Sequence, residues 1–161
     1  MADARLGFGL CFHSELELPE LAPGGSSEPD VVIRLGAAPQ QLAGANRVRR
    51  HGWATPDAFL FEAAGVARYL VAGGSEVTVE PYAGAEATRI RAFLLGSVLA
   101  ALCYQRGLLP LHANALETQG GAVALAGESG AGKSTLAAHL AARGYRMMGD
   151  DVCVLGAEPD L

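Results

Sequence analysis

The sequence predicts an α/β protein whose front part is α+β. Three short apolar runs separated by glycines lie between residues 58 and 80, which is typical of an antiparallel β-meander. Helical periodicity follows over residues 85–106, and an apolar run, a glycine-rich loop and a second helical pattern come after it in that order. We therefore expect two parts, a β-rich N-terminal segment at 1–82 and a helix with an α/β core at 83–161.

Size, charge and cysteine content limit the classes of function. The 161 residues are half hydrophobic and carry a net charge of −5, from 12 basic and 17 acidic residues, which argues against nucleic acid as the main partner. Cys11, Cys103 and Cys153 lack metal-ligand spacing and suit a reducing compartment, so a cytoplasmic protein is expected. The longest nearly apolar run, 92–104, is too short to span a bilayer, and no membrane partner is expected.

The N-terminal segment contains strands separated by turns. Strand-like runs occupy 6–12 and 16–18, and residues 31–35 form a clear strand before a polar surface connection at 36–52. The meander follows at 58–80, where Gly65 and the Gly73-Gly74 pair make tight turns. Its exposed edges could add a strand from a peptide partner.

A helix is predicted after the meander. Residues 85–106 place a set of side chains on or beside one face, and Gly107 stops the helix. An extended segment at 108–117 then turns through Gly120-Gly121 into the apolar run 122–126, which is expected to be a buried strand. The residues expected on the packed face of the helix are Ile90, Phe93, Leu94, Val98, Ala101, Leu102 and Gln105.

The stretch GESGAGKS at 127–134 matches the pattern G-x-x-x-x-G-K-[ST], a phosphate-binding loop or P-loop. Its glycines let backbone N–H groups converge on an anion, Lys133 can reach the β- and γ-phosphates, and the Ser134 hydroxyl can ligate Mg²⁺. A helical pattern ended by Gly144 follows, so the phosphates would lie at a helix N-terminus. The expected ligands are therefore ATP and Mg²⁺, and the residues expected to contact the nucleotide are Gly127, Glu128, Ser129, Gly130, Ala131, Gly132, Lys133, Ser134 and Thr135.

Two further features narrow the chemistry. Asp150 and Asp151 precede an apolar strand pattern, and an acid beside bound phosphates can hold Mg²⁺ or accept a proton from a hydroxyl nucleophile. Adjacent acids on an extended segment point in opposite directions and could divide these roles. His112 lies in the extended segment before the phosphate-loop strand, so hairpin pairing would bring it toward the sheet edge or the loop, although a lone histidine there is more often a packed core residue.

Together these residues resemble the catalytic domain of HPr kinase/phosphorylase. The resemblance lies in LHANAL at 111–116, the loop GESGAGKST and GYRMMGDD at 144–151, with His112 21 residues before Lys133 and Asp151 18 residues after it. More closely, the β-rich front and the run RGLLPLHA at 106–113 look like the HPr-kinase-like proteins of bacterial peptide-tailoring (lasso-type) clusters. The resemblance covers roughly residues 108–156.

The resemblance implies a kinase that phosphorylates a serine of a small protein or peptide, a peptide precursor among the candidates. Asp151 would be the general base, and His112 would help to position the phosphates. Lys133 would neutralise charge. Ser134 would ligate Mg²⁺, and Asp150 would support the metal. Thr135 departs from the family, which commonly has an acid there. The resemblance also allows a homo-oligomer, and implies a truncated core, the N-terminal part of a longer kinase with a further carboxylate and a catalytic arginine.

Two other hypotheses remain open on the sequence. In a P-loop ATPase of another class, an acid would activate water, and hydrolysis would need no acceptor. In a non-enzymatic scaffold, the loop would bind nucleotide while the β-rich half recruited a peptide. Acceptor-free hydrolysis separates the first of these from a kinase.

Overall fold

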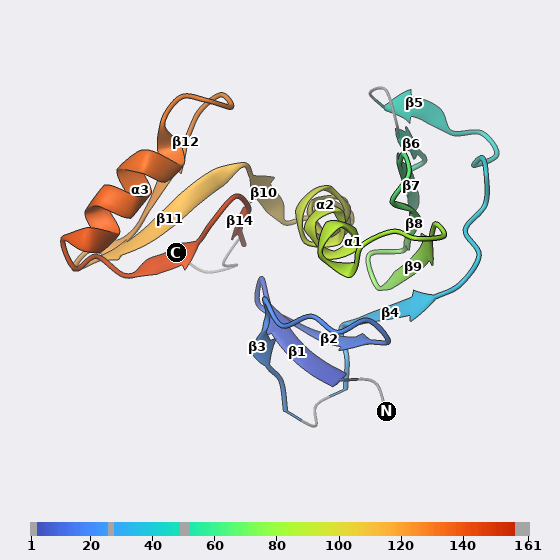
Figure 1. Ribbon diagram of the computed structural model, residues 1–161, viewed down its shortest axis with the longest axis horizontal. Helices are drawn as coiled ribbons and strands as arrows, with labels where there is room; N and C mark the ends of the chain where they lie inside the picture. Colours follow the sequence, from blue (N-terminus) through green and yellow to red (C-terminus); the bar gives the residue numbers. More distant parts are fainter. Residues whose placement is uncertain (1–2, 26–27, 49–51, 157–161) are drawn as a thin grey trace. The chain divides into compact units, whose positions relative to one another are not determined.

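The computed structural model describes residues 3–25, 28–48 and 52–156, and its secondary structure is mixed and rich in strands, in line with the predicted class (Figure 1). The chain divides into two compact units, Met1–Gly107 and Leu108–Leu161. The sequence placed a boundary after residue 82, whereas the structure groups the helix of residues 87–105 with the strands before it. The reason is packing, because the buried face of this helix covers the sheet of the first unit.

Nine strands of the first unit form one mixed sheet in the order β3-β1-β2-β4-β9-β8-β7-β6-β5. The contacts of β4 with β2 and with β9 are parallel, and the other pairs are antiparallel. The strands are β1 (Asp3–Gly7), β2 (Leu10–Ser14), β3 (Ala22–Pro23), β4 (Val31–Leu35), β5 (Asn46–Val48), β6 (Gly52–Ala54), β7 (Ala58–Ala63), β8 (Ala67–Ala72) and β9 (Glu76–Pro81).

The predicted meander is present as β7, β8 and β9. Gly73 and Gly74 take left-handed φ values of +56° and +64° as the central residues of a turn that the Ser75 N–H closes on the Ala72 carbonyl at 3.2 Å. Strand β7 also pairs with β6, and β9 also pairs with β4. The edges of residues 58–80 are therefore occupied, and the prediction that they could add a peptide strand is wrong.

The start of the chain differs from its predicted strands. Residues 6–12 are a hairpin rather than one run, because Phe8 and Gly9 turn the chain with φ values of +55° and +74° between β1 and β2. Residues 16–18 form no strand, although Leu18 is fully buried. The connection at 36–52 includes β5 and the start of β6, and its residues 49–51 lie outside the described part of the chain.

The predicted helix is continuous but changes its winding. It runs as α1 (Ala87–Phe93), a π-helical segment η1 (Leu94–Val98) and α2 (Leu99–Gln105). Four residues expected on the packed face are buried, and so are Leu99 and Cys103, which the α-helical pattern did not include. The π-helical turn absorbs one extra residue and shifts the buried face of α2 by one position.

The helix packs against β8 and completes the core of the first unit. The Tyr69 hydroxyl donates to the Ile90 carbonyl at 3.0 Å, and burial raises the pKa of Tyr69 to about 12. By length and composition alone, Ala87–Gln105 could cross a membrane, but here it is the core helix of the sheet. The buried core consists of Leu10, Phe12, Leu18, Val31, Ile33, Ala63, Val66, Ala67, Tyr69, Val71, Val77, Val79, Ile90, Leu94, Val98, Leu99 and Leu102.

A polar network crosses β7, β8 and β9. The Arg68 side chain is only 14% exposed, and its guanidinium lies 3.2 Å from Glu80 Oε2 and 3.7 Å from Glu62 Oε1. Arg68 Nη2 also donates to the Tyr82 hydroxyl at 3.1 Å, and that hydroxyl donates to Glu62 Oε1 at 2.6 Å. The hydrogen bond to Glu62 raises the pKa of Tyr82. Arg68 therefore neutralises two carboxylates that would otherwise face each other.

We expect Arg68→Ala to lower the free energy of unfolding by about 2 kcal/mol, because it leaves two half-buried carboxylates without their cation. Urea denaturation followed by circular dichroism measures this. The matched control is Arg34→Ala, whose ion pair with Glu76 spans 3.6 Å with side chains 57% and 61% exposed. That change should alter stability by less than about 0.5 kcal/mol. Equal losses in the two variants would contradict the role given to Arg68.

Over residues 108–156, the second unit has two small antiparallel sheets and one helix. Strand β10 (Leu109–Leu111) pairs with β14 (Cys153–Leu155), and a three-stranded sheet has the order β12-β11-β13. Helix α3 (Lys133–Ala142) packs against β11 and β12. The strands of the second sheet are β11 (Ala113–Thr118), β12 (Gly121–Ala126) and β13 (Met147–Gly149).

The strand before the glycine-rich loop is exposed, which corrects the expectation of a buried strand at 122–126. Among the described residues, strand β12 pairs with β11 alone and lies at the edge of its sheet, so Val123 is 46% exposed. Ala137 is the buried residue of α3, and Leu136 is 48% exposed. Apolar composition predicted a strand, but it could not tell how many neighbours that strand would have.

Candidate functional site

The phosphate-loop motif lies between a strand and a helix, in the order that the sequence predicted. Strand β12 ends at Ala126, and α3 begins at Lys133. Gly130 and Gly132 take φ values of +83° and +84°, a left-handed conformation that a residue with a Cβ rarely adopts. No side chain caps the start of α3, so the first backbone N–H groups of this helix face outward from its N-terminus. These amides and the helix dipole favour an anion at this end.

Lys133 folds back over the loop. Its Nζ donates to the Gly127 carbonyl at 2.9 Å and to the Glu128 carbonyl at 3.0 Å, while the amide of Ala131 donates to the same Glu128 carbonyl at 3.2 Å. These bonds hold the loop in a compact turn around the ammonium group of Lys133. The other residues expected to contact nucleotide, including Ser134 and Thr135 in the first turn of α3, are exposed and accessible to a ligand.

His112 and the loop both adjoin the end of the β11–β12 hairpin. The β11–β12 pairing runs from Thr118↔Gly121 to Ala113↔Ala126. His112 directly precedes β11, in the break between β10 and β11, and Gly127 directly follows β12. The hairpin turn consists of Gln119 and Gly120, one residue earlier than the predicted turn at Gly120-Gly121.

His112 also meets the acidic turn. Its Nδ1 lies 2.9 Å from the Asp151 carbonyl oxygen and 3.6 Å from the Asp151 carboxylate. A carbonyl oxygen can only accept, so Nδ1 carries the proton in this contact. The side chains of His112 and Asp151 are 56% and 80% exposed, which leaves both open to a substrate.

The two acids lie on a tight turn rather than on an extended segment. The amide of Val152 donates to the Asp150 carbonyl at 2.8 Å, and Asp151 between them has a φ of +69°. This is a γ-turn of the uncommon, strained kind. The expectation that the acids point in opposite directions assumed an extended backbone. Instead, both contact residues at or just before the start of β11, because the Asn114 amide Nδ2 donates to Asp150 Oδ1 while His112 contacts Asp151.

Sequence reasoning gave no role to Asn114 or Cys153, although both support this turn. Asn114 is 2% exposed, and the buried Cys153 Sγ donates to the Ala113 carbonyl at 3.0 Å. Burial raises the pKa of the Cys153 thiol, with the nearby Asp150 charge adding to the effect, so the thiol keeps the proton that it donates. The sequence signal for Asn114 was a lone amide among the apolar residues of 113–116, two residues after His112.

The donor set suits Mg²⁺ only together with phosphate oxygens. In residues 3–25, 28–48 and 52–156, no group of three or more His, Cys, Asp or Glu side chains lies close enough to hold a metal ion by itself. Ser134 and Asp150 supply one hydroxyl and one carboxylate. Mg²⁺ at nucleotide sites is ordinarily held by one or two protein oxygens plus phosphates and water, and a hydroxyl and a carboxylate are oxygens of that kind.

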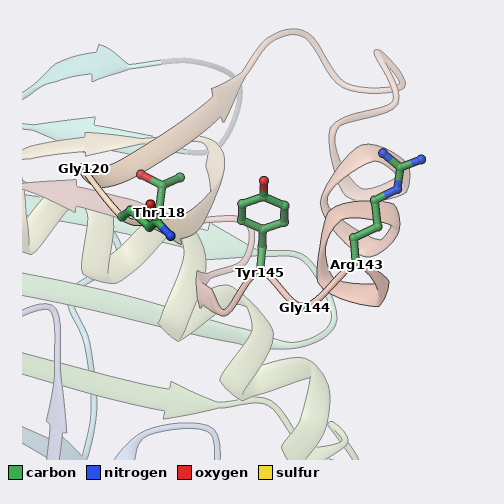
Figure 2. A pocket seen from close by; sticks show the side chains of 6 residues that line it. Thr118, Gly120, Arg143, Gly144 and Tyr145 are labelled. Carbon is green, nitrogen blue, oxygen red and sulfur yellow. The ribbon is translucent and has the colours of Figure 1, made fainter.

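A hollow of about 630 Å³ lies at the other end of the hairpin and helix (Figure 2). It is formed by the β11–β12 turn and the end of α3, whereas the loop follows the end of β12 and precedes the start of α3. Gly144 ends α3 as predicted, with a φ of +95° and its N–H bonded to the Ala141 carbonyl at 2.9 Å. This hollow is separate from the candidate site, and its lining residues are Thr118, Gln119, Gly120, Arg143, Gly144 and Tyr145.

Comparisons of the chain with protein-family models, with curated proteins and with solved structures gave no match. The conclusion about function therefore rests on the chemistry of the residues in the second unit. That unit brings His112 into contact with Asp151 and Asn114 into contact with Asp150, on a hairpin that leads directly into the loop.

Proposed function

We propose that this chain is a kinase, or part of one, that transfers the γ-phosphoryl group of ATP to a serine hydroxyl of a small protein or peptide. One observation carries the proposal: His112, which directly precedes the β11–β12 hairpin leading to the loop, contacts the Asp151 carbonyl oxygen through Nδ1 at 2.9 Å. A sequence motif typical of phosphate binding, a histidine and an acid thus belong to one unit. Phosphoryl transfer needs this kind of positioning more than it needs covalent chemistry.

The loop would hold the nucleotide. Backbone N–H groups of residues 127–132 and of the first turn of α3 would surround the β- and γ-phosphates, and Lys133 would exchange its two carbonyl acceptors for phosphate oxygens. Ser134 and Asp150 would hold Mg²⁺, which supplies charge neutralisation to the phosphates. The expected nucleotide ligand is therefore ATP with Mg²⁺.

Asp151 would act on the acceptor. Its carboxylate is 80% exposed, so a serine hydroxyl can approach it from solvent. In the transfer, Asp151 accepts the hydroxyl proton as the serine oxygen forms its bond to the γ-phosphorus, and the bond from that phosphorus to the β,γ-bridging oxygen breaks to leave ADP. His112 would orient the Asp151 turn through its Nδ1 contact. The buried thiols Cys103 and Cys153 suit the cytoplasm, where such a kinase would work.

The proposal is tested with [γ-³²P]ATP, Mg²⁺ and a library of serine-containing peptides. We expect label on serine peptides, none on the same peptides with alanine in place of serine, and slower phosphate release without peptide. Rapid release of phosphate without any acceptor, with no peptide labelled, would instead favour an ATPase. Absence of ATP binding by the chain, measured by calorimetry, would refute both.

A further inference from the structure

A buried amide stands beside the acidic turn. Asn114 is 2% exposed in β11, between Ala113 and Leu116 on the same strand, which are 0% and 2% exposed. A buried amide destabilises a protein unless it forms hydrogen bonds, and an apolar side chain would suit this position better on packing grounds alone. Its partner is Asp150, whose Oδ1 accepts from Nδ2. A carboxylate can only accept from an amide, so the NH₂ group faces the acid.

The amide belongs to a set of contacts from three successive residues. His112 contacts Asp151, the Ala113 carbonyl accepts from Cys153 Sγ, and Asn114 contacts Asp150. Together they hold the turn in which Asp151 has its left-handed backbone. Of the three contacts, the one from Asn114 alone bonds to the carboxylate of Asp150.

We infer that Asn114 is a positioning residue, which fixes the Asp150 carboxylate so that its second oxygen faces the nucleotide's Mg²⁺. The inference rests on the proposed function, because it concerns the same nucleotide site. One oxygen of Asp150 is engaged by the amide, which stops rotation of the carboxylate and leaves the other oxygen available. Partners of metal-binding side chains typically change metal affinity by 10–100-fold when removed, even though they do not touch the ion.

The contact itself is tested without nucleotide. In ¹⁵N–¹H spectra of the whole chain, the side-chain NH₂ signals of Asn114 are assigned by their loss in Asn114→Leu, a change of similar shape. We expect Asp150→Asn to shift these signals. Glu117→Gln is the matched control on β11, since Glu117 pairs with Arg146, and it should leave them in place. Unchanged signals in Asp150→Asn would overturn the inference.

The consequence is tested with ATP and Mg²⁺ as probes. Asn114→Leu should raise the Mg²⁺ concentration needed for half-maximal ATP binding by about tenfold or more. Combined with Asp150→Asn, it should add nothing to the effect of Asp150→Asn alone, because the two residues act through one contact. A shift in thermal unfolding without a change in Mg²⁺ requirement would mean a structural role only and would refute the inference.

Failure of the positioning role of Asn114 can be distinguished from failure of the proposed kinase function. If the wild-type chain binds ATP in a Lys133-dependent way and Asn114→Leu keeps the wild-type Mg²⁺ requirement, the positioning role is wrong and the kinase proposal stands. If the wild-type chain does not bind ATP, or binds it equally well after Lys133→Met, the proposed function fails and the positioning role fails with it. The spectra would then still decide whether Asn114 holds Asp150.

Discussion

Replacing Lys133 with methionine is expected to weaken the binding of MgATP by about 100-fold. The ammonium group of Lys133 already sits within the loop, bonded to two carbonyls, and phosphates would offer it charged acceptors in their place. Hydrogen bonds to charged groups contribute about 1.5–3 kcal/mol, and the upper end of that range corresponds to this loss of affinity. Methionine keeps an unbranched apolar stem of similar length, so the change removes mainly the charge.

Calorimetric titration with MgATP measures the loss. Arg143→Met is the matched control, because Arg143 is a cation at the opposite end of α3, and its removal should leave the affinity unchanged within about threefold. Lys133 is also the only lysine in the chain, so protection of one side-chain amine by ATP can be followed with an amine-reactive reagent. Affinity within threefold of wild type in Lys133→Met, or no protection by ATP, would rule out the loop as the nucleotide site.

Changing Asp151 to asparagine is expected to abolish transfer to serine peptides while nucleotide binding is retained. A positioned general base contributes typically 10²–10⁴-fold to a rate, and an amide cannot accept the hydroxyl proton. Asparagine is chosen because, like aspartate, it tolerates the left-handed backbone that Asp151 adopts at a φ of +69°. The contact of His112 with the backbone carbonyl of residue 151 should also survive.

The two readouts are the transfer rate with labelled ATP and the dissociation constant of MgATP. We expect the rate to fall by at least about 100-fold and the dissociation constant to change by less than about threefold. Asp151→Ala provides a second variant, which loses the same proton acceptor but also strains the turn, at a cost of order 1 kcal/mol. Transfer at the wild-type rate in Asp151→Asn would show that another group is the base.

Local sequence patterns predicted the strands and helices well, but they predicted less well which elements pair or pack with one another. Alternating residues and glycine pairs identified the meander of β7–β9, and the hairpin turn predicted at Gly120-Gly121 located β11 and β12. Composition could not predict that β12 lies at a sheet edge, since the same alanine-rich run suits a central strand equally well. It also could not assign the helix of residues 87–105 to the first unit, because its apolar face does not say which sheet it covers.

The site was predictable where it depends on spacing and not where it depends on tertiary contact. The loop motif placed Lys133 and Ser134 at the start of α3, and the predicted hairpin placed His112 directly before β11 and Gly127 directly after β12. The γ-turn at Asp151 was not foreseen, because an acidic pair before an apolar strand pattern is compatible with extended backbone. The partnership of Asn114 with Asp150 joins residues 36 positions apart, and only the folded chain brings them together.

The π-helical segment η1 has a consequence for chain length. Because this segment winds more widely than an α-helix, it holds one residue more than α-helical packing would need between Leu94 and Leu99, whose N–H donates to the Leu94 carbonyl. Neither Gly96 nor Ser97 within it is buried. Removing either would convert the segment to a plain α-helix while the buried residues on both sides keep facing the sheet. At this point the chain can become one residue shorter without rearranging its core, whereas elsewhere in a packed helix such a deletion rotates every following side chain away from its neighbours.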